Sequence, residues 1–525
     1  MVYDLLILNG HILDGTGNPW FKADVGLVGD RIEAVGKLVR EKADRRINAE
    51  GCIVAPGFID IHSHSDVPLL VDPRAESKIH QGVTTEVVGN CGSSAAPMSN
   101  AVRKYRERYA RSAVGDDFQF DWRTMADYLA RLDRQGVAVN VAPLVGHGTV
   151  RHNIMGYEAR EPTDSELGRM RRLVDAAMRE GAWGISTGLI YPPSVYAKTD
   201  EIVELAKTSA RHGGIYASHI RGEGETLLDA VGEAIEVGER SGAPVEIAHF
   251  KASGKAYWGK TRESHRLVEE ARARGVDVTF DQYPYIASST GLSSVLPHWA
   301  HEGGAEKMME RLRDPATRKR LEAEGRTDRD WSDIIVVYVK NNQRYIGKRI
   351  TEIAEMEGKE PADAAFDLLL AEDTQVQTVM FGLGEEDVRF VMRSPYMMVG
   401  SDGSAVSPKG ILGKGQPHPR YYGTFPRVLG HYARDEGIIT LQEAVRKMTS
   451  APAQRMGFKD RGLLREGYKA DIAVFDPLRV KDEATFTDPH RFASGIPYVL
   501  VNGTVVINKG KQTSALPGKT LKKSQ

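Results

Sequence analysis

The amino-acid sequence predicts an α/β fold: a (β/α)8 TIM barrel, a small β-sandwich domain built from both termini, and a lid-like insertion before the last barrel strand. Three observations predict this fold. Short apolar runs alternate with amphipathic stretches through the middle of the chain, which is typical of a barrel. Both ends of the chain carry Asn-Gly between apolar runs. One interval between two strands is far longer than a βαβ unit needs.

The two ends of the chain predict β-hairpins. Residues 5–14 and 498–507 both place Asn-Gly between apolar runs, a strong hairpin signal because Asn and Gly tolerate the positive φ of a type I′ turn. Residues 24–35 predict another hairpin, and residues 470–475 a strand. The alternative is two unrelated hairpins, but neither alone buries enough surface to be stable. We therefore expect one β domain made of residues 1–57 and 450–525.

The barrel is expected within residues 58–449. Its strands are predicted from eight apolar runs, the first of which begins in the preceding domain: 53–61, 84–89, 137–145, 184–187, 215–218, 245–248, 276–281 and 396–401. The helices between them are predicted from amphipathic stretches that include 165–180, 200–212, 226–241 and 264–274. Strands that alternate with helices in this way predict a parallel, closed sheet.

One interval, between residue 281 and the strand before Asp402, is too long for a single βαβ unit. The excess is expected at about 285–346. It holds a Ser/Thr-rich segment at 287–290, a charged helix around 307–324 and a strand at 334–339. Its place above the carboxyl ends of the strands suggests a lid over the substrate, and a purely structural insertion is the alternative.

Composition excludes several classes of protein. The chain has 525 residues, a net charge of −1 and an apolar fraction of 41%, which suits a soluble globular protein. Charges of both signs are interspersed, so no nucleic-acid or membrane partner is expected, and the basic segment 519–523 is expected to be a frayed end. Two cysteines and the lack of a signal-peptide pattern favour the cytoplasm. The sequence does not indicate an oligomeric state.

A set of potential metal ligands closes the predicted strands. Each member follows an apolar run: His62, His64, Cys91, His219, His249 and Asp402. Taken singly, such residues are often structural histidines, a buried cysteine or a turn aspartate. Imidazole, thiolate and carboxylate are also the ligands that divalent transition metals prefer, and strand ends converge at the mouth of a barrel. Together they predict a metal centre that activates water, and hence a metal-dependent hydrolase.

The chain also resembles a known family over essentially its full length. The resemblance rests on Ala-Pro-Gly-Phe-Ile-Asp-Ile-His-Ser-His (55–64), Gln-Gly-Val-Thr-Thr-Glu-Val-Val-Gly-Asn-Cys-Gly (81–92), Gly-Leu-Ile-Tyr-Pro-Pro (188–193), Ser-His-Ile-Arg-Gly-Glu (218–223), Ala-His-Phe-Lys (248–251), Asp-Gln-Tyr-Pro-Tyr (281–285), Gly-Ser-Asp-Gly (400–403) and His-Pro-Arg-Tyr-Tyr-Gly-Thr-Phe-Pro-Arg-Val-Leu-Gly (418–430). With these motifs the chain resembles the amidohydrolase superfamily, and within it the N-acyl-D-amino-acid deacylases (D-aminoacylases). The cysteine of Gly-Asn-Cys-Gly is the more specific signal, since many relatives hold their metals with a carboxylated lysine.

The resemblance implies a role for each matching residue. It implies one tight zinc site at Cys91, His219 and His249, and a second, weaker site at His62 and His64. It also implies that Asp402 is the catalytic acid/base. For substrate binding it implies that Arg420 grips the α-carboxylate with help from Tyr283 and Ser289, and that Lys251 and Tyr191 line the site.

The expected activity is zinc-dependent hydrolysis of the amide bond of N-acyl-D-amino acids. A thiolate and two neutral imidazoles leave zinc an open position for water, and a planar guanidinium matches a carboxylate. A dipeptidase that releases a carboxyl-terminal D-residue is an alternative, because its substrate is itself an N-acyl amino acid. A cyclic-amide hydrolase of the hydantoinase or dihydroorotase kind and a metal-free assembly protein are two further alternatives.

Overall fold

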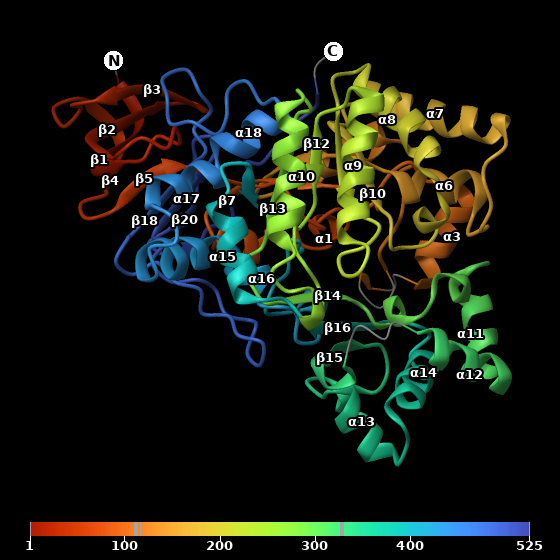
Figure 1. The fold of residues 1–525 in the computed structure, drawn as a ribbon. Helices are drawn as coiled ribbons and strands as arrows, with labels where there is room; N and C mark the ends of the chain where they lie inside the picture. Colours follow the sequence, from red (N-terminus) through yellow and green to blue (C-terminus); the bar gives the residue numbers. More distant parts are fainter. Residues whose placement is uncertain (1, 110–113, 116, 326–329, 524–525) are drawn as a thin grey trace.

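The structure is a computed structural model that describes residues 2–109, 114–115, 117–325 and 330–523. It consists of a barrel surrounded by helices, a sheet that combines both ends of the chain, and an inserted unit (Figure 1). Within the described residues no helix has both the length and the apolar character that a membrane span requires.

The barrel has eight parallel strands in the described part of the chain. In order around the ring they are β6 (Phe58–Asp60), β7 (Val83–Val88), β8 (Asn140–Pro143) with β9 (Val145–Gly146), β10 (Gly184–Gly188), β11 (Ile215–His219), β12 (Val245–Ile247), β13 (Val278–Gln282) and β17 (Met397–Val399). β8 pairs with β7 and β9 pairs with β10, so these two short segments act as one barrel strand. A parallel bridge between Ser63 and Gly403 joins the two ends of the ring. The predicted barrel is confirmed.

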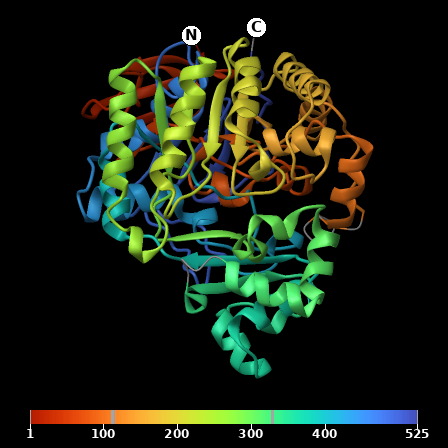
Figure 2. The ribbon, with the colours of Figure 1, turned by 45° about the vertical axis from the view of Figure 1, so that its right-hand side comes forward.

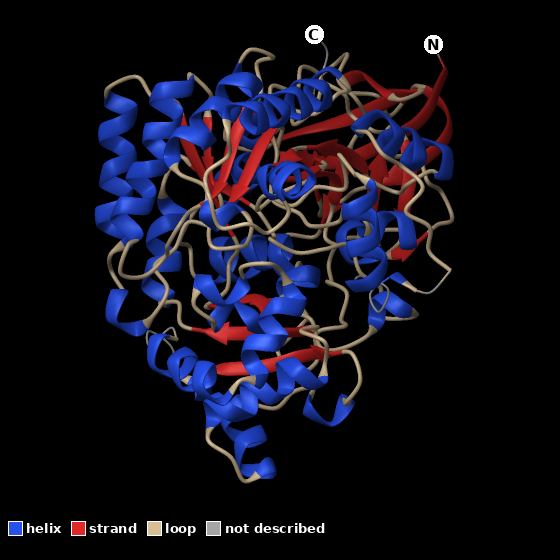
Figure 3. Ribbon diagram, turned by 90° about the vertical axis from the view of Figure 1, so that its right-hand side faces the viewer, coloured by secondary structure: helices blue, strands red, loops and turns tan. Residues whose placement is uncertain are grey.

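Helices cover the outside of the barrel, as Figures 2 and 3 show. They are α5 (Met125–Gln135), α6 (His147–Met155), α7 (Asp164–Arg179), α8 (Thr199–Ala210), α9 (Leu227–Ser241), α10 (Thr261–Ala273), α15 (Glu385–Arg393) and α17 (Leu441–Met448). Each expected amphipathic stretch is helical. In α9, for example, Leu227, Val231 and Ile235 recur at a spacing of four residues and are all buried.

The first predicted strand is divided between two sheets. Residues 53–61 were expected to form one strand, but β5 (Ile53–Pro56) joins the terminal sheet and β6 begins the barrel. The break falls at Gly57, where a Cβ atom would lie 2.3 Å from the side chain of Thr84. Only glycine fits this close approach. The chain passes from the terminal sheet to the barrel at this residue, which is the boundary between the two predicted domains.

The two ends of the chain share one nine-stranded sheet in the described residues. Its other members are β1 (Val2–Ile12), β2 (Phe21–Val28), β3 (Arg31–Gly36), β4 (Lys42–Asn48), β18 (Ile472–Phe475), β19 (Tyr498–Val501), β20 (Thr504–Asn508) and β21 (Lys511–Gln512). The halves meet where β18 pairs antiparallel with β5. The predicted joining of the two termini is therefore present.

The two Asn-Gly pairs behave differently. Asn502-Gly503 forms the predicted turn between β19 and β20, with φ of 46° and 78°. The predicted hairpin at residues 5–14 is wrong, because β1 runs straight through Asn9-Gly10. There Asn9 has φ of 63°, and the pairing with β2 shifts register between Ile7 and Gly10. Positive φ serves a bulge at one site and a turn at the other.

The inserted unit is larger than predicted. It contains an antiparallel sheet of order β14-β16-β15 and, packed with it, α11 (Ala305–Arg313), α12 (Pro315–Glu324), α13 (Ile350–Glu357) and α14 (Pro361–Ala371). The strands are β14 (Ala287–Gly291), β15 (Ile334–Val339) and β16 (Val376–Phe381). The central strand, β16, lies beyond the predicted end at residue 346, so the unit continues to about Phe381. The unit has its own hydrophobic core and lies below the barrel in Figure 1.

The remaining elements are short or connect these units. The α-helices are α1 (Pro68–Val71), α2 (Glu76–Ile79), α3 (Asn100–Tyr109), α16 (Arg420–Arg427) and α18 (Ser450–Met456), and a π-helix, η8, spans Val428–Asp435. The 3-10 turns are η1 (Ser194–Tyr196), η2 (Lys255–Tyr257), η3 (Leu292–Val295), η4 (His298–His301), η5 (Trp331–Asp333), η6 (Gln343–Tyr345) and η7 (Ile411–Gly413). The expectation of a frayed tail at 519–523 is wrong. The Val141 N–H donates to the Lys519 carbonyl and the Leu521 N–H donates to the Val141 carbonyl, which holds this segment beside β8.

Candidate metal centre and active site

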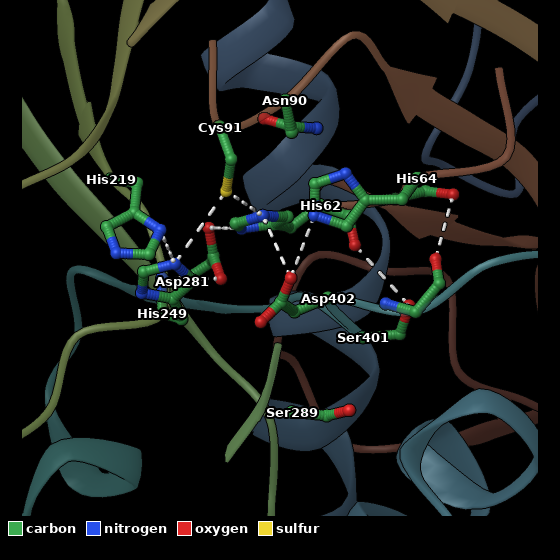
Figure 4. Close-up of polar contacts among 12 residues, drawn as sticks. His62, His64, Asn90, Cys91, His219, His249, Asp281, Ser289, Ser401 and Asp402 are labelled. Carbon is green, nitrogen blue, oxygen red and sulfur yellow. Dashed lines mark hydrogen bonds and ion pairs between the residues drawn. The ribbon is translucent and has the colours of Figure 1, made fainter. Parts of the chain in front are cut away.

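The predicted ligands converge at the carboxyl ends of the barrel strands (Figure 4). Their ligand atoms form two groups, each within 4.8 Å: Cys91 with His219 and His249, and Cys91 with His62, His64 and Asp402. Residues far apart in the sequence meet here because parallel strands end at the same edge of a barrel.

The group at Cys91 is compact. Cys91 Sγ lies 3.3 Å from His62 Nε2 and 3.8 Å from His249 Nε2, and His249 Nε2 lies 2.9 Å from His219 Nδ1. A sulfur and two imidazole nitrogens thus face one point, an arrangement that suits zinc. The donor atoms of these residues therefore fit a zinc ion.

The pKa shifts of Cys91 and His219 favour metal binding. Burial acts to raise the pKa of the Cys91 thiol, but the charge of His62 and hydrogen bonds from His219 and His249 hold that pKa well below its usual range. Burial and the neighbouring His249 lower the pKa of His219. A thiolate and a neutral imidazole are the forms that bind a metal.

The backbone is strained at this site. Cys91, His249 and Asp402 have φ of 50°, 38° and 47°, in the left-handed region that non-glycine residues rarely adopt. Such residues persist only where the surrounding structure fixes them, and they cluster at functional sites. In each case the strained residue follows the end of a barrel strand and turns its side chain towards the cluster.

Two acidic residues orient the histidines. Asp281 accepts a hydrogen bond from the backbone N–H of His249 at 2.9 Å, and its other oxygen lies 2.9 Å from His62 Nδ1. Glu223 Oε1 lies 3.0 Å from His249 Nδ1. A carboxylate that accepts a hydrogen bond from the Nδ1–H of a histidine leaves the Nε2 of that ring free to bind a metal. Neither residue was among the predicted site residues, although Glu223 lies in the motif at 218–223 and Asp281 in the motif at 281–285.

Asp402 lies between the histidines and a buried arginine. Its Oδ1 is 2.9 Å from His64 Nε2, and its Oδ2 is 2.9 Å from Arg420 Nη1. Burial acts to raise the pKa of Asp402, but the charges of Arg420 and His62 and the hydrogen bond with His64 hold that pKa well below its usual range. The carboxylate is therefore ionised, as a general base must be.

Three of the predicted substrate residues form one wall. The Arg420 guanidinium lies 4.7 Å from the centre of the Tyr283 ring, and its Nη2 donates to the Ser289 carbonyl at 3.3 Å. Among the described residues, Arg420 Nε and the Tyr283 hydroxyl have no hydrogen-bond partner although both are buried, whereas Arg420 Nη1 is held by the ion pair with Asp402. The Ser289 hydroxyl instead donates to the carbonyl of Thr378 at 2.8 Å. The wall thus retains unused donors.

The other two predicted substrate residues have partners of their own. The Lys251 ammonium lies 2.8 Å from His249 Nδ1 and also donates to Glu223. The Tyr191 hydroxyl lies 3.0 Å from the Thr290 hydroxyl, and its ring meets the His219 ring edge-on at 5.0 Å. Lys251 therefore neutralises the charge of Glu223, and Tyr191 packs beside the predicted ligand His219.

A cavity of about 840 Å³ opens from the cluster. The predicted ligands other than His62 and the predicted substrate residues lie on its walls, together with residues of the inserted unit: Ser288, Thr290, Tyr338, Thr374, Gln375 and Gln377. The insertion therefore covers part of the mouth of the barrel. That placement is the one a lid requires.

Known proteins share this architecture. The model of a family described as the amidohydrolase family matches residues 45–507. A D-aminoacylase of Alcaligenes xylosoxydans xylosoxydans is 39% identical over 519 residues, which cover 99% of this chain and 97% of that protein.

Two solved structures extend the comparison. A D-aminoacylase structure, solved in work on its binuclear metal centre, has a TM-score of 0.84 and 38% identity and covers 99% of this chain and 100% of its own. An N-acyl-D-glutamate deacylase from Bordetella bronchiseptica, in complex with zinc and a phosphonate mimic of the tetrahedral intermediate, has a TM-score of 0.84 and 34% identity with the same coverage.

A barrel that presents thiolate, imidazole and carboxylate groups to a cavity at its carboxyl end has the design of a metal-dependent hydrolase. The chain belongs to the amidohydrolase family. Within that family its similarity to D-aminoacylase and N-acyl-D-glutamate deacylase extends over nearly the whole chain.

Proposed function

We propose that this protein hydrolyses the amide bond of N-acyl-D-amino acids, releasing a carboxylate and a free D-amino acid. One observation carries the proposal: Arg420 keeps an unused buried Nε–H on the cavity wall beside Asp402 and the metal cluster. A substrate with a carboxylate next to its scissile amide would meet both features at once. The likeness to D-aminoacylase over nearly the whole chain supports the same choice.

In this proposal Cys91, His219 and His249 hold one zinc ion tightly. His62 and His64 form a second, weaker site, because the His64 Nε2 that would bind the metal is already bonded to Asp402. Bound zinc would polarise the amide carbonyl and make a water molecule more acidic at neutral pH. We expect a cytoplasmic protein, because Cys91 has to stay reduced to bind metal.

Asp402 takes the proton from the attacking water and gives it to the departing amine. This role needs an ionised carboxylate within reach of the cluster, and Asp402 meets both conditions. Arg420 offers its unpaired Nε–H to the α-carboxylate, while its Nη1 stays on Asp402 and the ring of Tyr283 packs against the guanidinium. Fixing the carboxylate and the carbonyl, while the walls confine the side chain, distinguishes D from L.

We propose further that the side chain of the substrate is uncharged. Among the described residues that line the cavity, Arg420 is paired with Asp402 and Lys251 with Glu223. Arg106 donates to backbone carbonyls, and Lys414 is exposed at the rim. Inside the described cavity a second buried carboxylate would therefore have to compete with backbone carbonyls for Arg106, and leaving it unpaired is costly.

A substrate screen tests the proposal. We would measure kcat/KM for the N-acetyl derivatives of methionine, leucine and glutamate in both enantiomers, together with a dipeptide ending in a D-residue and a hydantoin. The expected order is D-methionine and D-leucine above D-glutamate, with little activity on L-enantiomers. Preference for the L-series or the hydantoin would refute the proposed activity, and preference for D-glutamate would refute only the uncharged side chain. Faster turnover of the dipeptide would favour a dipeptidase.

A further inference from the structure

A buried lysine lies beneath the loop that carries Asp402. Lys78, in the short helix α2, has a fully buried side chain. Its ammonium donates to Asp60 Oδ2 at 2.7 Å, to the Ser401 hydroxyl at 2.7 Å and to the Gly403 carbonyl at 3.1 Å. These contacts use all three donors of the ammonium group. Two of them hold the residues on either side of Asp402.

The same contacts fix the backbone of that loop. Asp60 accepts hydrogen bonds from both the backbone N–H and the hydroxyl of Ser401. The Ser401 hydroxyl in turn accepts the backbone N–H of Gly403 at 3.1 Å. Asp402, between them, has a strained φ of 47°, which the surrounding contacts must maintain.

We propose that Lys78 is a positioning residue that sets the direction of the Asp402 carboxylate by holding the backbone on both sides of it. The inference rests on the proposed role of Asp402 as proton shuttle. Lys78 does not line the cavity, and its direct route to Asp402 runs through Ser401 and Gly403. A second route runs through Asp60, which also accepts the backbone N–H of His62 at 3.3 Å, so the zinc content of each variant has to be measured beside kcat.

The charges around Lys78 decide which variants are useful. Glu86 Oε1 also lies 3.4 Å from the ammonium, so Lys78→Met leaves two buried carboxylates, Asp60 and Glu86, without a cation. That variant can fail to fold. Ser401→Ala keeps the charged cluster and removes one link between Lys78 and the Asp402 loop, so it tests the same idea without the charge imbalance.

The chain offers a matched control at the opposite end of the same barrel strand. Lys447 is also fully buried, and it donates to the carbonyls of Ser394 and Met397 at the amino end of β17. Lys447→Met also removes a buried ammonium group, but one that contacts the opposite end of β17, far from Asp402. A general effect of losing a buried lysine would appear in both variants.

The experiment compares kcat, KM, zinc content and Tm of these variants as zinc-loaded full-length protein. Lys78→Met should lower kcat by about 10²-fold and Ser401→Ala by about tenfold, with zinc retained, because a small misplacement of a catalytic group is costly. KM should change less than twofold, because the carboxylate-binding wall is untouched. Lys447→Met, at the same folded fraction, should keep the wild-type kcat.

A double-mutant cycle separates positioning from general destabilisation. Adding Ser401→Ala to Asp402→Asn should cause no further loss of kcat, because the base that it positions is already gone. Three results would overturn this inference and leave the proposed function standing. They are full additivity in the double mutant, equal losses of kcat in Lys78→Met and Lys447→Met, and wild-type kcat in Ser401→Ala. Wild-type kcat in Asp402→Asn would overturn the proposed function, and the inference with it.

Discussion

Arg420 and Asp402 form a buried ion pair, with Nη1 2.9 Å from Oδ2. The residue proposed to bind the substrate carboxylate therefore touches the residue proposed to move the proton. The pair has two consequences. Arg420 keeps Asp402 ionised, and a substrate carboxylate has to share the guanidinium with Asp402. A guanidinium has five N–H donors, so both carboxylates can be bound at once.

Replacing Arg420 with Ala should therefore cause two losses. One is common to all substrates, because the pKa of Asp402 is no longer held down by its neighbour. The other, about 3–5 kcal/mol, falls only on substrates that carry the α-carboxylate. We expect kcat/KM to fall much more for an N-acyl-D-amino acid than for its decarboxylated analogue. Arg427→Ala, on the same helix but paired with Asp482, is the control. Equal losses on both substrates would show that Arg420 does not bind the carboxylate.

Replacing Cys91 with Ala should abolish zinc retention and activity together. Cys91 belongs to both ligand groups and supplies their only thiolate among the described residues. Metal analysis of the purified protein after dialysis measures the effect. Cys52→Ala is the matched control, because Cys52 is the other free cysteine and lies outside both groups. Full zinc occupancy in Cys91→Ala would remove Cys91 from the tight site.

Replacing Asp402 with Asn should lower kcat by about 10²–10⁴-fold, because the shape is kept while the base is lost. The tight zinc should stay bound, since Cys91, His219 and His249 are intact. Asp387→Asn is a control at another buried aspartate, one that bonds Thr261 on the outside of the barrel. If Asp402→Asn kept more than about a tenth of the wild-type turnover, Asp402 would not be the proton shuttle.

Stability should fall in mild acid through His80. Burial lowers the pKa of His80 to about 4, and its ring stacks on Phe492 at 4.1 Å. In the unfolded chain a histidine has a pKa near 6.5, so between pH 6.5 and pH 4 the unfolded state binds more protons. The free energy of unfolding should therefore be highest above pH 6.5 and decline as the pH falls towards 4, by at most about 1.4 kcal/mol per pH unit from this group.

Urea denaturation of wild type and His80→Asn at several pH values measures this effect. The variant should show a smaller decline between pH 6.5 and pH 4. His152 and His301 have pKa values lowered to about 4 by burial as well, so part of the decline should remain. The same pH dependence in both proteins would mean that His80 does not carry this part of the acid sensitivity.

Much of the site could be predicted from the sequence alone. Each predicted ligand follows an apolar run. Because parallel strands end at one edge of a barrel, this position was enough to predict that the ligands lie close together. Element type was also predictable where the signal is local. The spacing of Leu227, Val231 and Ile235 specifies a helix face, and Asn502-Gly503 specifies a turn.

Other features depend on which segments pack together. Asn9-Gly10 has the same two residues as the turn at 502–503, yet it forms a bulge because β1 continues along its neighbours. The insertion continues past the predicted end at residue 346 because its central strand, β16, follows two helices and pairs with two strands that precede them. Strand pairing across such distances leaves no local pattern in the sequence.

The sequence by itself determined the barrel, the joining of the two termini and the residue types gathered at the candidate metal centre, because these follow from periodicity and from residue type. The tertiary structure alone decided the contacts between side chains: Asp281 on His62, Arg420 on Asp402 and Lys78 beneath Ser401. Each joins residues from different strands or helices. The physical reason is that hydrogen bonds and ion pairs act over about 3 Å, so they depend on the final packing rather than on neighbours along the chain.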